Sequence, residues 1–488
     1  SKTIIYYNVI TNLLAMNKKI LLNQEKNFKA DFGFIYRSSA IFYVPRKIKT
    51  TISILNYWKF KNKKDVVILI TEREMNGKLV RRREKNFSFN SVLSISDFLI
   101  EEGSVEVEAF SNSNIKIPYA AAMIVYDSIN SISMVHSYSR NHSLVELENN
   151  DSITKGRESC WTIRPQFNNS ALFHNGHLEV NEQKAKLILT NSKNKDKALF
   201  FIIPKLKPYQ TFRFDLEKIY PKFNKHLINE EGFGTLHFKN NSSFTRLLIV
   251  WSDKSNKNFQ TTHSNFDYSK YITNKLKSHK GAEMPFAHFK NNLQSSQLII
   301  YPKFEKNIFT LKLDNEIIDK KINSGKILNI SKNTSRATFS SMNNIVPSRL
   351  VTALSGKSKN QKIPFECSLG VVHEKTQKKR FSWSLISAKY KTYVHLNFNN
   401  ILKPEKKFQL FFTAYNAKNL DILNKSIYID KKDFSSPLIF ELEELFPNHK
   451  NFLKKEYGYL TLFTKNSALR MLTSFYSSKK GITLEHSF

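Results

Sequence analysis

A histidine followed by a serine occurs at three distant points of the chain, His136-Ser137, His263-Ser264 and His486-Ser487. An imidazole ring and a hydroxyl group both exchange hydrogen bonds with polar ligands. Each pair also ends a strand-like run, so we expect the pairs and the polar residues beside them to bind a ligand. This predicted ligand-binding set is His136, Ser137, Tyr138, Arg140, His263, Ser264, Asn265, Asp267, His486 and Ser487.

Two other interpretations of these pairs stay open. In a structural role, each histidine bonds a backbone carbonyl at the edge of its own module. In a catalytic role, Asp267 completes a hydrolase triad with His263 and Ser264. Triad members normally come from separate elements, and no Gly-x-Ser-x-Gly turn accompanies them. We therefore predict no catalytic residue.

The chain shows no complete set of metal or phosphate ligands. His174 and His177 flank an Asn-Gly turn, which places the two rings across a hairpin. A zinc site needs at least a third protein ligand, and the sequence identifies none. Gly232-Phe233-Gly234 lacks the spacing of a phosphate-binding loop. The prediction is no metal and no cofactor.

Two arginines, Arg246 and Arg470, lie among apolar residues of predicted strands. A partly buried guanidinium needs a partner, and we favour Asp215 and Glu441 of the same modules. A ligand carboxylate or phosphate is the alternative partner.

Composition describes a folded, strongly basic chain. With 488 residues it is long enough for roughly three or four domains. Its 41% hydrophobic and 13% aromatic residues exclude global disorder. The formal charge of +35 attracts polyanions such as nucleic acid or acidic polysaccharide. The abundance of Lys, Asn, Ile, Phe and Tyr also fits an AT-rich genome, and the basic residues are scattered, so both origins of the charge stay open.

The cysteines and the apolar runs of the sequence indicate in which cellular compartment we expect the protein. Cys160 and Cys367 are the two cysteines, which argues against a disulfide scaffold and favours two buried thiols. The most apolar interior run, 117–126, is shorter than the ~20 residues of a membrane helix. We expect a soluble cytoplasmic protein without a transmembrane segment, with a leader removed before residue 1 left open.

An internal repeat is visible when the chain is compared with itself. The stretch 215–221, Asp-Leu-Glu-Lys-Ile-Tyr-Pro, matches 441–447, Glu-Leu-Glu-Glu-Leu-Phe-Pro, at an offset of 226 (441 − 215). The same offset pairs Gly232 with Gly458, and a weaker copy follows Gly103. Acids in the first turn and a closing Pro predict a short helix in the stretch.

The front halves of the copies predict antiparallel strands. Thr51–Ile70, Lys184–Ile203 and Lys391–Ala414 each show two partly alternating apolar runs around an Asn and a Lys-rich turn. The fold class is therefore mainly β, with tandem repeated antiparallel β-sandwich modules that each carry a short helix. The predicted boundaries are an N-terminal arm or short helix (1–30), module 1 (31–147), module 2 (148–272), a connecting or degenerate β unit (273–345) and module 3 (346–488).

The second module resembles a known family. It begins with Cys160-Trp161 and ends in a strand whose exit carries His263. This order is similar to the β-sandwich domain of the bacterial sensory rhodopsin transducer family. Module 3 has Cys367 followed by Ser368, and module 1 has 37–39, Arg-Ser-Ser, at the corresponding place. The resemblance implies a sandwich fold and a binding module for small carbohydrates or a protein partner.

Our leading hypothesis is a non-enzymatic, multi-module binding or assembly protein. It recognises a polar or anionic ligand, such as a saccharide or polysaccharide, or a protein partner. One alternative is an enzyme that acts on a saccharide or its modification in an intermodule cleft, using His263 or Asp267. The other, less favoured, is nucleic-acid binding through the basic surface.

Overall fold

The computed structural model describes the chain in segments, and the statements below concern these residues. They are 36–87, 89–111, 122–141, 159–239, 246–265, 282–285, 295–302, 309–314, 316–322, 325–331, 333–341, 351–370, 380–398, 407–430, 437–465 and 469–487.

The strands form eight four-stranded antiparallel sheets, grouped in four units of eight strands each. We name them unit 1 (36–136), unit 2 (159–263), unit 3 (282–370) and unit 4 (380–486). Every unit has the same topology. Its first, sixth, third and fourth strands form an outer sheet, and its fifth, second, seventh and eighth strands form an inner sheet. The predicted fold class is confirmed.

The strands of units 1 and 2 are as follows. Unit 1 contains β1 (Tyr36–Val44), β2 (Lys49–Leu55), β3 (Val67–Glu74), β4 (Leu79–Asn86), β5 (Val92–Ile95), β6 (Gly103–Ser111), β7 (Ala122–Asp127) and β8 (Ile132–His136). Unit 2 contains β9 (Ser159–Ile163), β10 (Asn168–His174), β11 (Gln183–Thr190), β12 (Asp196–Ile203), β13 (Thr211–Asp215), β14 (Gly232–His237), β15 (Leu248–Ser252) and β16 (Phe259–His263).

Units 3 and 4 repeat the same series. Unit 3 contains β17 (Ala282–Pro285), β18 (Ser295–Ile300), β19 (Phe309–Leu313), β20 (Glu316–Ile322), β21 (Lys326–Ile330), β22 (Arg336–Ser341), β23 (Val351–Lys357) and β24 (Phe365–Gly370). Unit 4 contains β25 (Arg380–Ser387), β26 (Lys391–Phe398), β27 (Lys407–Tyr415), β28 (Ile422–Asp430), β29 (Leu438–Glu441), β30 (Tyr457–Thr464), β31 (Leu469–Ser477) and β32 (Gly481–His486).

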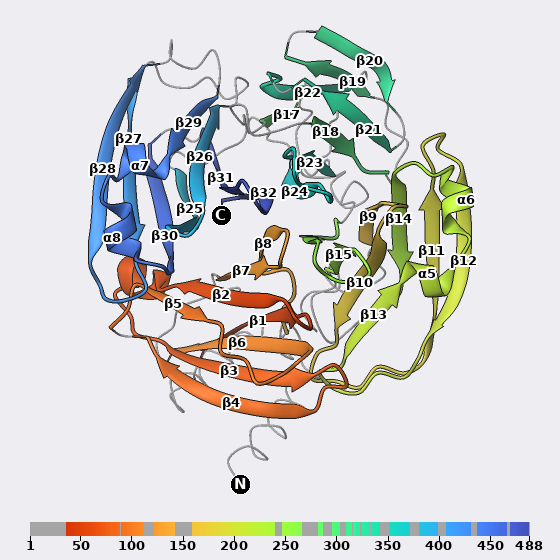
Figure 1. Cartoon of the computed structure of the whole chain (residues 1–488), viewed down its shortest axis with the longest axis horizontal. Helices are drawn as coiled ribbons and strands as arrows, with labels where there is room; N and C mark the ends of the chain where they lie inside the picture. Colours follow the sequence, from red (N-terminus) through yellow and green to blue (C-terminus); the bar gives the residue numbers. More distant parts are fainter. Residues whose placement is uncertain are drawn as a thin grey trace, which may run out of the picture.

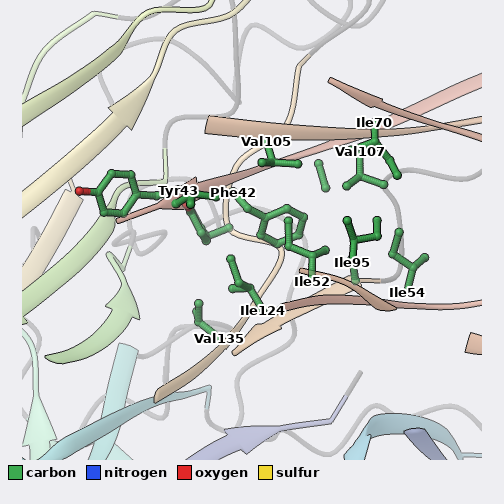
Figure 2. Packing of buried hydrophobic residues seen from close by; sticks show 14 of the residues in the cluster. Phe42, Tyr43, Ile52, Ile54, Ile70, Ile95, Val105, Val107, Ile124 and Val135 are labelled. Atoms are coloured by element: carbon green, nitrogen blue, oxygen red, sulfur yellow. The ribbon is translucent and has the colours of Figure 1, made fainter. Parts of the chain in front are cut away.

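Each unit is a sandwich because its strands are apolar on the face that meets the other sheet. In β27, Phe408, Leu410 and Phe412 are buried while Lys407 and Phe411 are exposed, the period-2 pattern of a half-buried strand. Figure 2 shows the result in unit 1, where isoleucines of the inner sheet face valines and Ile70 of the outer sheet. This contact between the two sheets is the core of the unit.

The helices are short. The predicted segment at 215 forms α5 (Leu216–Ile219), and its repeat forms α7 (Leu442–Leu445), which begins with a capping box between Glu441 and Glu444. Each is followed by a second turn, α6 (Phe223–Leu227) or α8 (His449–Leu453). Unit 1 instead has a π-helical turn, η1 (Trp58–Asn62), after β2, and the described part of unit 3 contains no helix.

Glycines that mark the repeat lie where strands approach closely. A Cβ on Gly232 would lie 2.5 Å from the carbonyl oxygen of Thr190 on the neighbouring strand. A Cβ on Gly458 would lie 2.3 Å from that of Tyr415, and one on Gly103 would also meet the carbonyl of its neighbour. Only glycine fits such an approach without a shift of the backbone.

Strand pairing moves the predicted boundary at 346. β23 and β24 follow that boundary, yet β23 pairs with β18 and β24 pairs with β23. The predicted connecting unit 273–345 therefore contributes the first six strands of unit 3, and 351–370 completes it. Unit 4 begins at β25. The predicted arm, 1–30, lies outside the described residues.

Two of the alignments that the sequence predicted between repeat copies are wrong, because each matches strands that hold different positions in their units. The stretch 184–203 covers β11 and β12, whereas 51–70 and 391–414 cover strands two and three of their units. The true counterpart of β2 and β26 is β10. Cys367 lies in β24, the last strand of unit 3, and does not head a module as Cys160 does. Both cysteines are buried free thiols, as predicted.

The four units surround a common centre in chain order (Figure 1), with the last strand of each inner sheet nearest to it. There β8 contacts β16, β16 contacts β24, β24 contacts β32, and β32 contacts β8. Each inner sheet has one face against the outer sheet of its own unit, and its other face packs on a neighbouring unit. Representative contact residues are Phe259 of unit 2 against unit 1, Met134 of unit 1 against unit 4, Leu484 of unit 4 against unit 3, and Tyr301 of unit 3 against unit 2.

Candidate functional site

The closed ring brings three of the predicted site residues together at its centre. His136 ends β8, His263 ends β16 and His486 ends β32, so three different units each contribute one ring. We call these three residues the histidine hub. The strand that unit 3 contributes to the centre, β24, contains no histidine.

The rings of the hub are in direct contact. The centroid of His136 lies 4.6 Å from that of His263 and 4.9 Å from that of His486, in edge-to-face arrangements. One nitrogen of each histidine lies within 4.8 Å of the others. His136 and His263 are buried, and His486 is partly exposed. A group that binds between the rings would therefore touch all three units.

Backbone carbonyls fix the tautomers of two hub histidines. Nδ1 of His263 lies 2.9 Å from the carbonyl oxygen of Ser264, and Nδ1 of His486 lies 3.2 Å from that of Ser487. A carbonyl oxygen only accepts, so in each ring Nδ1–H is the donor. In the neutral ring the lone pair is then on Nε2. Both histidines present Nε2 as an acceptor.

Two side chains give His136 the same tautomer, with the proton on Nδ1. Its Nδ1 lies 3.4 Å from a carboxyl oxygen of Glu485, and its Nε2 lies 3.4 Å from Nη1 of Arg246. Because a guanidinium only donates, Nε2 of His136 accepts and Nδ1 carries the proton. Glu485 also lies 3.5 Å from Nε2 of His486.

Burial keeps two of the three hub histidines neutral. Removal from water lowers the pKa of His263 well below 6.5, and the positive charge of Arg246 lowers it further. Burial likewise lowers the pKa of His486 to about 4, although Glu485 acts in the opposite direction. For the Glu485 carboxyl, burial raises the pKa while His486 and Arg246 oppose the shift. At neutral pH, His263 and His486 are therefore uncharged acceptors.

The serines of the predicted pairs have a different role from the histidines. Ser264 donates its backbone N–H to the carbonyl of Leu247 and accepts from the N–H of Leu247 at Oγ, 2.9 Å away. Ser137 donates from N and Oγ to the carbonyl of Ala122, and Ser487 donates from N to that of Met471. The serines thus extend the strand pairing. The structural interpretation of the pairs concerned the histidines, and the contacts of His263 and His486 with backbone carbonyls of their own units agree with it.

The remaining predicted residues are not part of the hub. Tyr138 is fully buried in unit 1, where its hydroxyl accepts from the N–H of Tyr43. Arg140 is half-buried two residues further on. Asn265 bonds the backbone of Cys160 and the hydroxyl of Ser368, which links unit 2 to unit 3. Asp267 lies outside the described residues.

Two residues at the hub were not part of the predicted set. Glu485 precedes His486, but Val135 and Thr262 hold the corresponding places before the other histidines, so the repeat gives no signal for it. Arg246 was expected to pair with Asp215. In the structure the Asp215 carboxylate lies 2.7 Å from Nε of Arg213 and 2.9 Å from Nζ of Lys218, and Arg246 lies at the hub instead.

Other candidate features of the sequence are structural. His174 is buried and lies 3.0 Å from the hydroxyl of Tyr138 and 2.9 Å from that of Thr211, and burial lowers its pKa to about 3. Among the basic residues, Arg81 and Arg83 both face Glu72, and Arg83 also pairs with Asp97. These two arginines are therefore engaged by neighbouring acids.

Within the described segments, no helix combines the length and apolar character that a membrane span requires.

Comparison with known proteins adds no assignment. The chain matches no model of a protein family, and no curated protein matches it significantly.

Proposed function

We propose that this chain is a non-enzymatic binding protein that holds a polar, acidic ligand at the histidine hub. The observation that supports it is the convergence of three imidazole acceptors from three units beside the guanidinium of Arg246. Duplicated sandwiches need no common centre in order to fold. A closed ring with polar groups at its centre therefore favours a shared binding site.

The chemistry of the hub selects the ligand class. Neutral imidazole nitrogens that act as acceptors match hydroxyl donors, of which a saccharide has several. A guanidinium matches a carboxylate or phosphate, often through two parallel hydrogen bonds. An acidic saccharide carries both kinds of group. We therefore favour a uronic-acid-containing oligosaccharide over a neutral sugar.

Binding of defined saccharides to the full-length chain tests this proposal. Galacturonic acid and glucuronic acid oligosaccharides are compared with neutral oligosaccharides of equal length by calorimetry. Arg246→Gln should weaken the acidic ligands at least tenfold and reduce the preference over the neutral ones. His263→Ala should weaken both classes. His226→Gln, on α6 and outside the hub, is the matched control and should have no effect.

Two results would overturn the proposal. One is an absence of binding across acidic and neutral saccharides. The other is binding that His263→Ala and Arg246→Gln leave intact, while near-ultraviolet circular dichroism shows both variants folded.

Glu485 supports a second candidate function, an enzyme that acts on a saccharide. A carboxyl group whose pKa is raised by burial lies within 3.5 Å of two hub imidazoles, which is a composition suited to proton transfer. Chromatography of the same oligosaccharides after long incubation tests it. Product formation that Glu485→Gln abolishes would favour the enzyme, and unchanged oligosaccharides would favour simple binding.

A further inference from the structure

The histidine hub has the arrangement of nitrogen donors that a transition-metal ion requires. Metal-binding histidines present one deprotonated nitrogen and donate the other N–H to a carbonyl or carboxylate. His263 and His486 do this with backbone carbonyls, and Nδ1 of His136 lies 3.4 Å from a carboxyl oxygen of Glu485. In all three rings Nε2 is the acceptor, and the three side chains converge.

We propose that the histidine hub binds one divalent transition-metal ion through the Nε2 atoms of His136, His263 and His486. This inference rests on the proposed function, because it takes the same hub as the binding site. It deepens that function by naming a metal ion as the partner through which an acidic ligand is held.

The separation of the rings is compatible with such an ion. One nitrogen of each ring lies within 4.8 Å of the others, so a point between three such nitrogens is at most about 2.8 Å from each of them in an equilateral arrangement. Zinc–imidazole bonds are about 2.0–2.1 Å long. Each ring therefore needs to move inward by less than about 1 Å, which a side-chain rotation provides.

The donor types select the class of metal. Imidazole nitrogen suits zinc, copper, nickel and iron, whereas calcium and magnesium prefer oxygen ligands. Because β24 contributes no histidine, the hub as formed by the described residues supplies three nitrogens rather than four. Three protein ligands leave a coordination position for a carboxylate or water, as in catalytic zinc sites. An acidic ligand fits that position.

Arg246 makes a specific contribution to this arrangement. Its Nη1 lies 3.4 Å from Nε2 of His136, so in the structure a guanidinium occupies the direction that a metal would take. The positive charge opposes a bare metal ion but favours a metal ion that carries an anionic ligand. Removal of Arg246 should therefore tighten the metal alone and weaken the acidic ligand.

Cobalt(II) binding to the full chain, produced without a histidine tag and treated with a chelator, tests the inference. We expect one Co²⁺ per chain by calorimetry, together with visible absorption bands of a nitrogen-ligated ion. His263→Ala and the milder His486→Gln should each weaken binding at least tenfold. Arg246→Gln should strengthen it by about tenfold. His226→Gln should leave it unchanged.

Folding is checked independently, since His263 is buried and its replacement can affect packing. His486 is partly exposed, so His486→Gln keeps the test valid if His263→Ala does not fold. The metal site is refuted if the folded wild-type chain binds no Co²⁺, or if binding survives His486→Gln unchanged. An unchanged affinity in Arg246→Gln would refute the competition between the guanidinium and the metal.

The metal-site inference and the proposed binding of an acidic saccharide can be refuted separately. An acidic saccharide that binds equally well before and after chelation contradicts the metal site and leaves the proposed function standing. Stoichiometric Co²⁺ binding without any saccharide affinity has the opposite meaning: the hub is a metal site, and the proposed ligand class is wrong. Absence of both excludes the hub as a binding site.

Discussion

Arg164 and Glu366 form a buried ion pair across the contact between unit 2 and unit 3. Nη2 of Arg164 lies 3.2 Å from the carboxylate, and the two side chains are 1% and 0% exposed. The guanidinium stacks on Trp251 at 4.5 Å, and the hydroxyl of Tyr301 donates to Glu366. Such a pair adds little net stability when intact, but breaking it leaves a buried charge.

This pair gives a prediction at the scale of single residues. Among the described residues, Glu366→Gln leaves the charged guanidinium of Arg164 with the partly exposed Glu231, 3.7 Å away, as its one counter-charge. We expect a loss of about 3 kcal/mol in the free energy of unfolding, measured in urea. Arg46→Gln, which breaks an exposed pair with Glu101, is the matched control and should cost less than about 1 kcal/mol. Equal losses in the two variants would contradict this account.

The sequence identified the hub only in part. The three histidines recur at strand ends, and that recurrence singled them out. Their convergence depends on ring closure, which local patterns do not encode. Glu485 occupies a position that other copies fill with Val135 or Thr262, so repetition could not reveal it. The serines recur for a different reason, because they continue the strand pairing.

At the scale of elements, Gly232 tests the physical basis of the repeat. A Cβ added there would lie 2.5 Å from the carbonyl oxygen of Thr190, so Gly232→Ala must move a backbone. The expected loss of stability is roughly 1–3 kcal/mol. For Gly234 on the same strand, the nearest atoms would be side-chain carbons of Ile163 and Trp161 at 3.0 Å. The midpoint temperature of thermal unfolding should therefore be lower for Gly232→Ala than for Gly234→Ala. The reverse order would contradict this account.

The strands themselves were easier to predict from the sequence than the strands with which they pair. Alternating burial in β27 and the capped α7 follow from local residue order. The alignment of 184–203 failed because every pair of neighbouring strands in such a unit has the same alternation and a similar turn. Unit 3 was not recognised as a full copy because its described part contains no helix and β22 begins at Arg336, where β6 and β14 begin at glycine.

At the scale of the whole molecule, the shared cores predict that neighbouring units unfold together. Phe259 of unit 2 belongs to the core cluster of unit 1, and its ring lies 5.3 Å from that of Tyr126. Phe259→Ala should cost roughly 3–5 kcal/mol. Hydrogen exchange should become faster in β2 and β7 of unit 1 as well as in β15 of unit 2. Faster exchange confined to unit 2 would show that the units are energetically separate.

The ring has one joint without a covalent link. The chain itself connects the first three pairs of neighbouring units, whereas unit 4 meets unit 1 through non-covalent contacts alone, among them a backbone hydrogen bond from the N–H of Ser91 to the carbonyl of Asn419. Asp127 of unit 1 pairs with both Lys389 and Lys480, and the hydroxyl of Tyr459 donates to the carbonyl of Ser53, 2.6 Å away. Separation of unit 4 from unit 1 at this joint would move His486 away from His136 and His263 without breaking any sheet. A molecule bound at the centre would therefore also hold unit 4 against unit 1.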